Sequence, residues 1–162
     1  MAQSSSQSDG ISRGIVKFNQ PALKTVCPAF DWNRPDHLQG LADLKATLID
    51  YPRALGLAAN QINFLARVFV MRLKGKVVVC ANPQVVQASG ITDIQKEECM
   101  SFPGLFVQVQ RPLAGEVTFD EDPTSRTMMK LHGWDFRCFL HELQHLEGIT
   151  ISSLKREGKN VP

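Results

Sequence analysis

Two histidines and a glutamate lie within one helical turn of each other in the segment His141-Glu142-Leu143-Gln144-His145. On a helix, residues four apart lie about 40° from one another, so both imidazoles face one point with Glu142 beside them. Neutral imidazole suits Zn, Fe, Ni or Cu ions, and a nearby carboxylate that is not a ligand can take a proton from metal-activated water. The spacing predicts a metal-dependent hydrolase. For this segment alone, a helix lined by histidines without any metal is the alternative.

A third ligand is needed, and Cys99 is the candidate that we favour. It lies in the polar stretch Glu97-Glu98-Cys99-Met100-Ser101. Thiolate is a good ligand for these metals, and three protein ligands leave a fourth position open for water. The alternatives are the remaining cysteines and histidines: Cys27, Cys80, Cys138, His37 and His132. Cys27 and Cys80 lie in or beside apolar runs, where a buried thiol is the default.

Three segments, taken in order, resemble the signature motifs of the peptide deformylase family. They are Ala54-Leu55-Gly56-Leu57-Ala58-Ala59-Asn60-Gln61, then Glu97-Glu98-Cys99-Met100-Ser101, then the histidine pair with Glu142. Ser101-Phe102-Pro103-Gly104 and Gln110-Arg111-Pro112 are similar to the plastid and bacterial branch, or to a short-tailed viral or divergent form of it.

This resemblance implies removal of the N-formyl group from the formyl-methionine of nascent peptides, with release of formate. One divalent ion would be held by Cys99, His141 and His145. Fe²⁺ is the expected native ion, and Zn²⁺ or Ni²⁺ are the alternatives. Glu142 would act as general acid and base, whereas donors aimed at the developing oxyanion would come from the Gln61 side chain and the Met100 backbone N–H.

The expected substrate contacts surround these groups. Trp134 and Cys138 fall on the same helical stripe as the histidines and, with Leu55, are predicted to wall an apolar methionine pocket. In a protein without metal the same stripe would be ordinary core. The full set of predicted substrate contacts is Leu55, Gly56, Glu97, Glu98, Gly104, Trp134 and Cys138.

Gly56 has two readings from the sequence. The absence of a side chain lets a substrate backbone approach and pair as an added strand. A tight connection that simply needs small residues explains the segment equally well.

Three positions depart from the family pattern: Ala54, Glu98 and Gln144. Because Gln144 stands where an aspartate is usual in the family, Arg111 would lack a carboxylate. Either Glu98 supplies one, or the region is exposed enough not to need one. Two other functions are considered, an inactive metal-binding homologue that acts as a binding protein and a metallopeptidase of the HExxH type. Glu142 and Gln61 are both present, which argues against the inactive form, and a peptidase would usually use His or Glu as its third ligand.

Composition and charge limit the remaining possibilities. The chain has 162 residues and is 43% hydrophobic, enough for one core. We expect a flexible leader over residues 1–10 and a single catalytic domain over residues 11–162. A net charge of +2 without a basic run predicts no direct reading of nucleic acid. Four irregularly spaced cysteines and no apolar span predict a cytoplasmic location without a membrane segment, an organelle being the alternative if the N-terminus is processed.

Periodicity predicts an α+β fold in which antiparallel sheets pack around a central metal-binding helix that carries the HExxH motif. The first expected helix is capped by Asp36, presents Leu38, Leu41, Leu44 and Leu48, and ends at Pro52. The second extends from about Trp134 to Glu147 and stops at Gly148. The expected strands are Arg67 to Leu73, Lys76 to Cys80, Pro83 to Gln87, Phe106 to Val109, Glu116 to Phe119 and Thr127 to Leu131.

The C-terminal tail is short: 14 residues follow Gly148. The resemblance is to bacterial enzymes that carry a longer C-terminal helix, which docks on the ribosome. We therefore expect ribosome association to be weak or absent, with full activity on free peptides.

Overall fold

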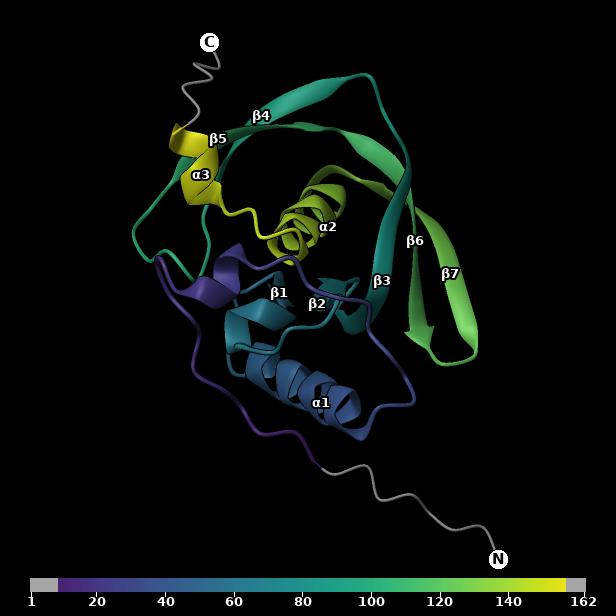
Figure 1. Ribbon diagram of the computed structural model, residues 1–162. Coiled ribbons are helices and arrows are strands. Elements are labelled where there is room, and N and C mark those ends of the chain that lie inside the picture. Colours follow the sequence, from purple (N-terminus) through teal and green to yellow (C-terminus); the bar gives the residue numbers. More distant parts are fainter. Residues whose placement is uncertain (1–8, 157–162) are drawn as a thin grey trace, which may run out of the picture.

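The computed structural model describes residues 9–156 and contains two antiparallel sheets with helices around them (Figure 1). The larger sheet has the strand order β1-β2-β3-β6-β7, and the smaller one pairs β4 with β5. The elements in chain order are η1 Pro21–Lys24, α1 Pro35–Ile49, β1 Gly56–Ala58, η2 Ala59–Ile62, β2 Val68–Leu73, β3 Lys76–Ala88, β4 Thr92–Glu97, β5 Val107–Pro112, β6 Ala114–Asp122, β7 Ser125–His132, α2 Gly133–Leu146 and α3 Ile151–Arg156. The predicted α+β class with antiparallel sheets is confirmed.

Helix α2 lies in the middle of the molecule, with strands of both sheets around it (Figure 1). Its apolar face packs on the larger sheet, where the Phe139 ring lies 5.1 Å from Phe69 and 6.2 Å from Phe119. The helix ends as predicted, because Gly148 adopts a φ of +71°. A side chain there would also meet the backbone oxygen of Lys24. The centre of the fold is therefore the segment that contains the histidine pair.

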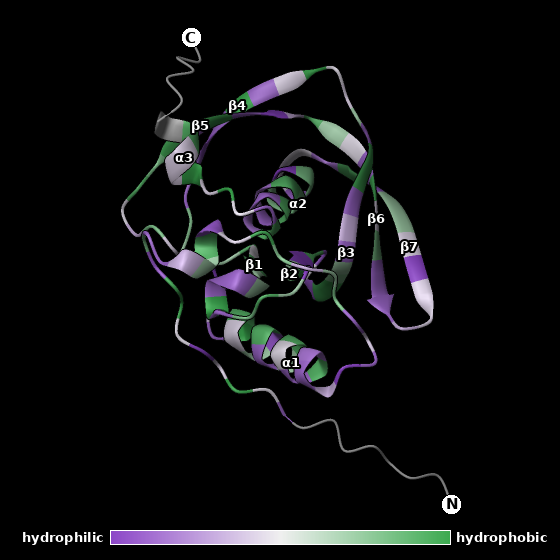
Figure 2. Ribbon diagram, in the orientation of Figure 1, coloured by the Kyte–Doolittle hydropathy of each residue, from purple (hydrophilic) through white to green (hydrophobic). Residues whose placement is uncertain are grey.

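Helix α1 covers the other face of the larger sheet. Leu41, Leu44 and Leu48 are buried there, and Figure 2 shows hydrophobic and hydrophilic residues mixed along α1, as expected of a helix with one apolar face. Two details of the prediction are wrong. Asp36 lies inside the first turn and pairs with the N-cap residue Arg34 at 2.6 Å, so it caps nothing, and Leu38 is exposed.

Strand β3 continues through a point where the sequence predicts a turn. Asn82 takes a φ of +48° and shifts the register between β3 and β6, so Asn82-Pro83 forms a bulge and the two predicted strands are one. The Asn82 side chain holds this position: its Oδ1 accepts from the Phe30 N–H at 2.9 Å, and its Nδ2 donates to the Phe30 carbonyl at 3.0 Å. The residues that predict a turn therefore form a bulge, and the Asn82 side chain binds the backbone of Phe30, earlier in the chain.

The short elements next to the site were not predicted. Strands β1 and β4 and helix α3 were missed, and the strand expected from Phe106 begins at Val107 and extends to Pro112. The strands predicted around Glu116–Phe119 and Thr127–Leu131 are confirmed with longer bounds, and the strand predicted from Arg67 begins one residue later, at Val68. Residues 1–8 of the predicted leader and residues 157–162 of the tail lie outside the described residues, so the prediction about ribosome binding stays a prediction. Among the described residues, no helix is long and apolar enough to cross a membrane.

Candidate active site

The three predicted metal ligands come together. The ligand atoms of Cys99, His141 and His145 all lie within 4.8 Å of one another, and the Cys99 Sγ is 3.3 Å from the His145 Nε2. Both histidines come from α2, whereas Cys99 follows the end of β4. The fold therefore joins two segments that are far apart in the sequence.

The chemistry of this donor set fits a divalent transition metal. One thiol and two imidazoles match Fe²⁺, Zn²⁺ or Ni²⁺ and do not distinguish between them. Cys99 and His145 are buried, whereas His141 is half-buried. The acceptors around His141 also favour positive charge there: although burial opposes it, Cys99 and Glu97 raise the pKa of His141 to about 10.

His141 is oriented by Glu97, whose Oε1 lies 2.9 Å from the His141 Nδ1. The same carboxylate accepts two bonds from Arg111, at 2.6 and 2.8 Å, and one from Arg137 at 2.7 Å. Although burial opposes ionisation, the bonds from Arg111 and His141 lower the pKa of Glu97 to about 2. Glu97 is one of the predicted substrate contacts, but its oxygens already bind these side chains. Its position suits it to orient His141 instead.

The partner predicted for Arg111 is wrong. Glu98 is exposed on the other side of the backbone from Glu97, and it is Glu97 that binds the guanidinium. Gln144 contributes as well, since its Oε1 accepts a bond from the Arg111 Nη1 at 3.0 Å. The loss of the usual aspartate therefore leaves Arg111 with a carboxylate and an amide.

Arg137 is the residue of this network that the sequence analysis left unassigned. It is buried, and its Nη2 pairs with the Asp93 Oδ1 at 2.7 Å while its Nη1 binds Glu97. A signal was available, because Arg137 stands one helical turn before His141 and thus on the same face. Sequence alone did not show that β4 would bring two acids to meet it.

Glu142 is buried beside the cluster, and its Oε2 has no hydrogen-bond partner among the described residues. Burial raises the pKa of this carboxyl to about 7, although the neighbouring His141 opposes the shift.

Gly56 leaves space for the Glu142 side chain: a Cβ on Gly56 would come within 3.0 Å of the Glu142 Oε1 and of the Cys138 Sγ. The close contact with α2 therefore favours glycine at this position, a reason that the separate segments of the sequence do not indicate.

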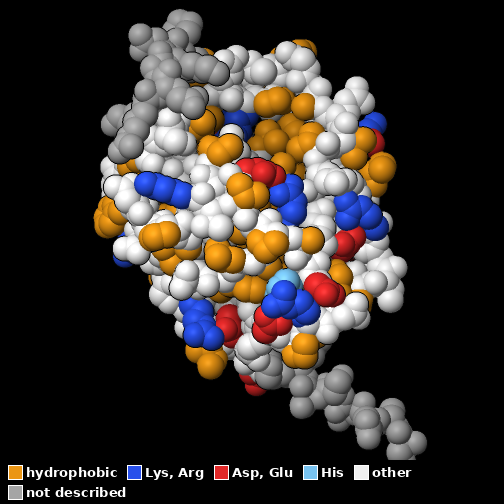
Figure 3. All heavy atoms as spheres, in the orientation of Figure 1, with side chains coloured by type: hydrophobic (Ala, Val, Ile, Leu, Met, Phe, Trp, Pro, Cys, Tyr) orange, Lys and Arg blue, Asp and Glu red, His pale blue; other side chains and the backbone are white. Residues whose placement is uncertain are grey.

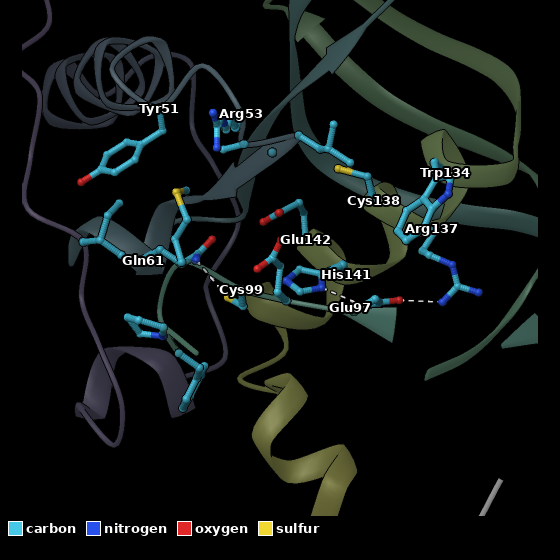
Figure 4. Close-up of a pocket in the computed structure, with 18 of the residues that line it drawn as sticks. Tyr51, Arg53, Gln61, Glu97, Cys99, Trp134, Arg137, Cys138, His141 and Glu142 are labelled. Atoms are coloured by element: carbon cyan, nitrogen blue, oxygen red, sulfur yellow. Dashed lines mark hydrogen bonds and ion pairs between the residues drawn. The ribbon is translucent and has the colours of Figure 1, made fainter. Parts of the chain in front are cut away.

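The Gln61 side-chain amide points toward Cys99 (Figure 4). Its Oε1 accepts from the Ala58 N–H at 3.0 Å, which directs the NH₂ group towards the Cys99 Sγ at 3.5 Å and the Ser101 Oγ at 3.1 Å. Gln61 is buried in η2. Its donor hydrogens therefore lie next to the proposed metal position.

A cavity of about 810 Å³ opens over this cluster. In Figure 4, Trp134 and Cys138 lie at one end, Tyr51 and Gln61 at the other, and Glu142 and His141 between them. Every predicted site residue except the fully buried His145 lines this cavity: Leu55, Gly56, Gln61, Glu97, Glu98, Cys99, Met100, Gly104, Trp134, Cys138, His141 and Glu142.

The order and spacing of these groups are matched by a family model described as polypeptide deformylase, over residues 12–160. The chain belongs to the polypeptide deformylase family. A peptide deformylase of Thermotoga maritima is 33% identical over 140 residues, which cover 85% of this chain and 83% of that protein. A second, from Thermotoga neapolitana, is 36% identical over 107 residues, covering 66% of this chain and 65% of that protein.

Solved deformylase structures share the fold. The crystal structure of the Thermotoga maritima peptide deformylase superimposes with a TM-score of 0.81 at 27% identity, covering 88% of this chain and 96% of that chain. An actinonin-bound class I type b enzyme of Acinetobacter baumannii gives 0.80 at 23% identity, covering 89% and 98%, which shows the fold alone. Family and fold favour deformylation over the two alternatives, a peptidase and an inactive binding protein.

Proposed function

We propose that the cavity removes the N-formyl group from formyl-methionyl peptides and releases formate. The observation that carries this proposal is the placement of the buried Glu142 carboxylate, whose Oε2 has no hydrogen-bond partner among the described residues, beside the cluster of Cys99, His141 and His145. Nascent formylated chains are the substrate class of the family, so a cytoplasmic location belongs to the same proposal.

The three clustered side chains would hold one divalent ion, which makes α2 the metal-binding helix. Fe²⁺ is the proposed native ion, and Zn²⁺ or Ni²⁺ would fit the same donors. When bound, such an ion lowers the pKa of a water molecule towards neutrality and polarises a carbonyl group.

Glu142 is the proposed general base and acid. Its pKa of about 7 suits a group that must accept a proton from the attacking water and then deliver it to the leaving amine. The Gln61 Nε2 and the Met100 backbone N–H are the proposed donors to the formyl oxygen as negative charge develops there. A donor of this kind typically contributes about 3 kcal/mol to the transition state.

The peptide would lie along the free edge of β1. That strand is at the end of the sheet order and contains Gly56, over which a substrate backbone can pass closely. Leu55, Trp134 and Cys138 are the proposed walls of the methionine pocket. Glu98 and Gly104 line the cavity farther out, where the following residues of the peptide would lie.

The decisive experiment measures formate release from formyl-Met-Ala-Ser by chain purified anaerobically with Fe²⁺ or Ni²⁺. We expect Glu142→Ala to retain about one metal ion per chain and to lose turnover by on the order of a hundredfold or more. The control is Glu121→Ala, since Glu121 is an exposed glutamate of β6 outside the cavity. Near-normal turnover of Glu142→Ala would contradict the mechanism, and cleavage of an unformylated internal peptide bond would favour a peptidase.

A further inference from the structure

The cavity extends well past the proposed metal position. Six consecutive residues of the loop between α1 and β1, residues 50–55, line one side of it. Lys17, Lys96 and Glu98 line the cavity as well. If the cavity binds formylated peptides, as proposed above, this outer part contacts the residues that follow the methionine.

The loop of residues 50–55 is held in place from behind by Arg72. The Arg72 guanidinium donates to the carbonyls of Leu48 at 3.0 Å, of Tyr51 at 3.1 Å and of Ala54. The Arg72 backbone N–H adds a bond of 2.8 Å to the Leu55 carbonyl. Because the backbone of the loop is fixed in this way, a ligand that binds its exposed side chains need not order the loop backbone as well.

The direction of β1 decides which peptide residues meet this loop. β1 begins at Gly56 and leads into η2, which carries Gln61 beside the cluster. A peptide antiparallel to β1 therefore starts at the cluster, passes Gly56 and continues towards residue 53. At about 3.3 Å per residue, its second and third residues come within reach of the Arg53 side chain.

The exposed charged side chains that line the outer part of the cavity do not cancel one another. Lys17, Arg53 and Lys96 are exposed and form no ion pair among the described residues; the Lys96 ammonium lies 5.5 Å from the centre of the Phe106 ring. Two acids, Asp50 and Glu98, also line this rim, which leaves an excess of one positive charge. In Figure 4, Arg53 lies between Tyr51 and Cys138.

We propose that Arg53, assisted by Lys17 and Lys96, makes the enzyme prefer formyl-methionyl peptides with an acidic side chain at the second or third residue. A guanidinium can bind a carboxylate through two parallel hydrogen bonds. Because Arg53 is exposed, the preference is modest, about two- to fivefold, and it falls as salt screens the pair.

The test compares kcat/KM for two series of C-terminally amidated peptides, formyl-Met-X-Ser and formyl-Met-Ala-X, with Glu, Gln or Lys at X. The amide removes the terminal carboxylate, which would otherwise mimic an acidic residue. We expect Glu to be preferred over Gln and Gln over Lys in at least one series, at low salt. The difference should lie in KM, because the contact is equally strong in ground and transition states.

Two substitutions of Arg53 and one matched control test whether the preference for acidic peptides depends on Arg53. Arg53→Gln is expected to abolish the preference, and Arg53→Glu to invert it. Lys76→Glu makes the same change of charge on an exposed residue at the start of β3, outside the cavity, and should keep the wild-type order. Equal kcat/KM for Glu and Lys peptides in both series, or a Lys76→Glu effect as large as that of Arg53→Glu, would overturn the proposal.

Equilibrium binding of the same peptides to Glu142→Gln separates this proposal from the proposed function. If no peptide yields formate but the binding order Glu, Gln, Lys persists, the deformylase mechanism fails and the role of Arg53 stands. If formate is released normally but all peptides bind equally, the role of Arg53 is overturned and the mechanism stands.

Discussion

The wall of the cavity formed by α2 and β4 is held by buried charged side chains, whereas the segment of residues 11–18, which contributes Ile15 and Lys17 to a second wall, is held by main-chain hydrogen bonds near the site and by a half-exposed ion pair farther away. On the first wall, Glu97, Arg111 and Arg137 are all nearly inaccessible and bind one another. On the second, the N–H groups of Val16 and Phe18 donate to the carbonyls of Gln61 at 2.7 Å and Ser101 at 2.9 Å.

The difference sets how each wall responds to substitution. Removing one member of a buried ion network leaves its partners charged and unpaired away from water, which is costly. A main-chain bond survives a change of side chain, provided that the backbone conformation is kept. Large effects are therefore expected on the first wall and small ones on the second. Figure 3 shows charged side chains of both signs interspersed over the face in view. Each exposed charge of this kind contributes little to the free energy of unfolding.

The largest effect is expected for Glu97→Gln. Arg111 and Arg137 would lose their shared counter-charge in a buried place, so the free energy of unfolding should fall by about 3 to 5 kcal/mol. His141 would lose the carboxylate that orients it, and metal affinity should fall by about 10- to 100-fold. Denaturant unfolding and metal titration measure the two effects separately.

The neighbouring Glu98→Gln is the matched control. Glu98 is exposed and has no ion pair among the described residues, so its stability change should stay within about 0.5 kcal/mol. Similar losses in the two variants would show that the buried network does not stabilise this wall.

The sequence predicted the parts of the site that depend on local spacing. Two histidines four residues apart must share a helical face, and the helix stops at a glycine that takes the left-handed conformation. The buried network was not predicted, because it depends on β4 bringing Asp93 and Glu97 against α2. The sequence of each segment alone does not indicate how they pack. Glu98 was therefore predicted as the partner of Arg111, although its neighbour Glu97 is the residue that points inward.

The fold shows the same limit. Regular apolar periodicity identified α1, α2 and the longer strands, but Asn82-Pro83 was misread because a bulge and a turn use the same residue types. β1 was missed because three residues carry no periodic signal. It is a strand only because β2 pairs with it.

An intermediate effect is expected for Asp43→Asn, which loosens the second wall. Asp43 accepts from the Ile11 N–H at 2.9 Å and pairs with Arg13 at 2.6 Å, which ties residues 11–13 to α1. Because Arg13 is half exposed, the loss should be about 1 to 2 kcal/mol at neutral pH.

The pH dependence of the stability difference between wild type and Asp43→Asn tests whether the charge of Asp43 causes it. Burial opposes ionisation of Asp43, but the bonds from Ile11, Arg13 and Gln39 hold its pKa below the usual value of 3.8. The unfolded chain therefore binds the proton more readily, and the stabilisation is complete above the usual pKa and lost as pH falls through the lowered one. The advantage of wild type over Asp43→Asn should shrink in acid. A difference independent of pH from 7 to 2 would mean that charge at Asp43 plays no part.

The smallest effect is expected at Phe18, where the second wall contains local strain. Phe18 adopts a φ of +61°, a left-handed conformation that costs a residue with a Cβ about 1 to 2 kcal/mol, and its side chain is 57% exposed. Phe18→Gly removes the strain and keeps the N–H bond to Ser101, but glycine gains entropy in the unfolded chain, which offsets about 0.5 to 1 kcal/mol of the benefit. Its net stability should therefore change by less than about 1 kcal/mol. Phe18→Ala removes the same side chain and keeps the strain, so urea unfolding should find the glycine variant more stable than the alanine variant. If alanine were equal or better, the side chain rather than the backbone would control this wall.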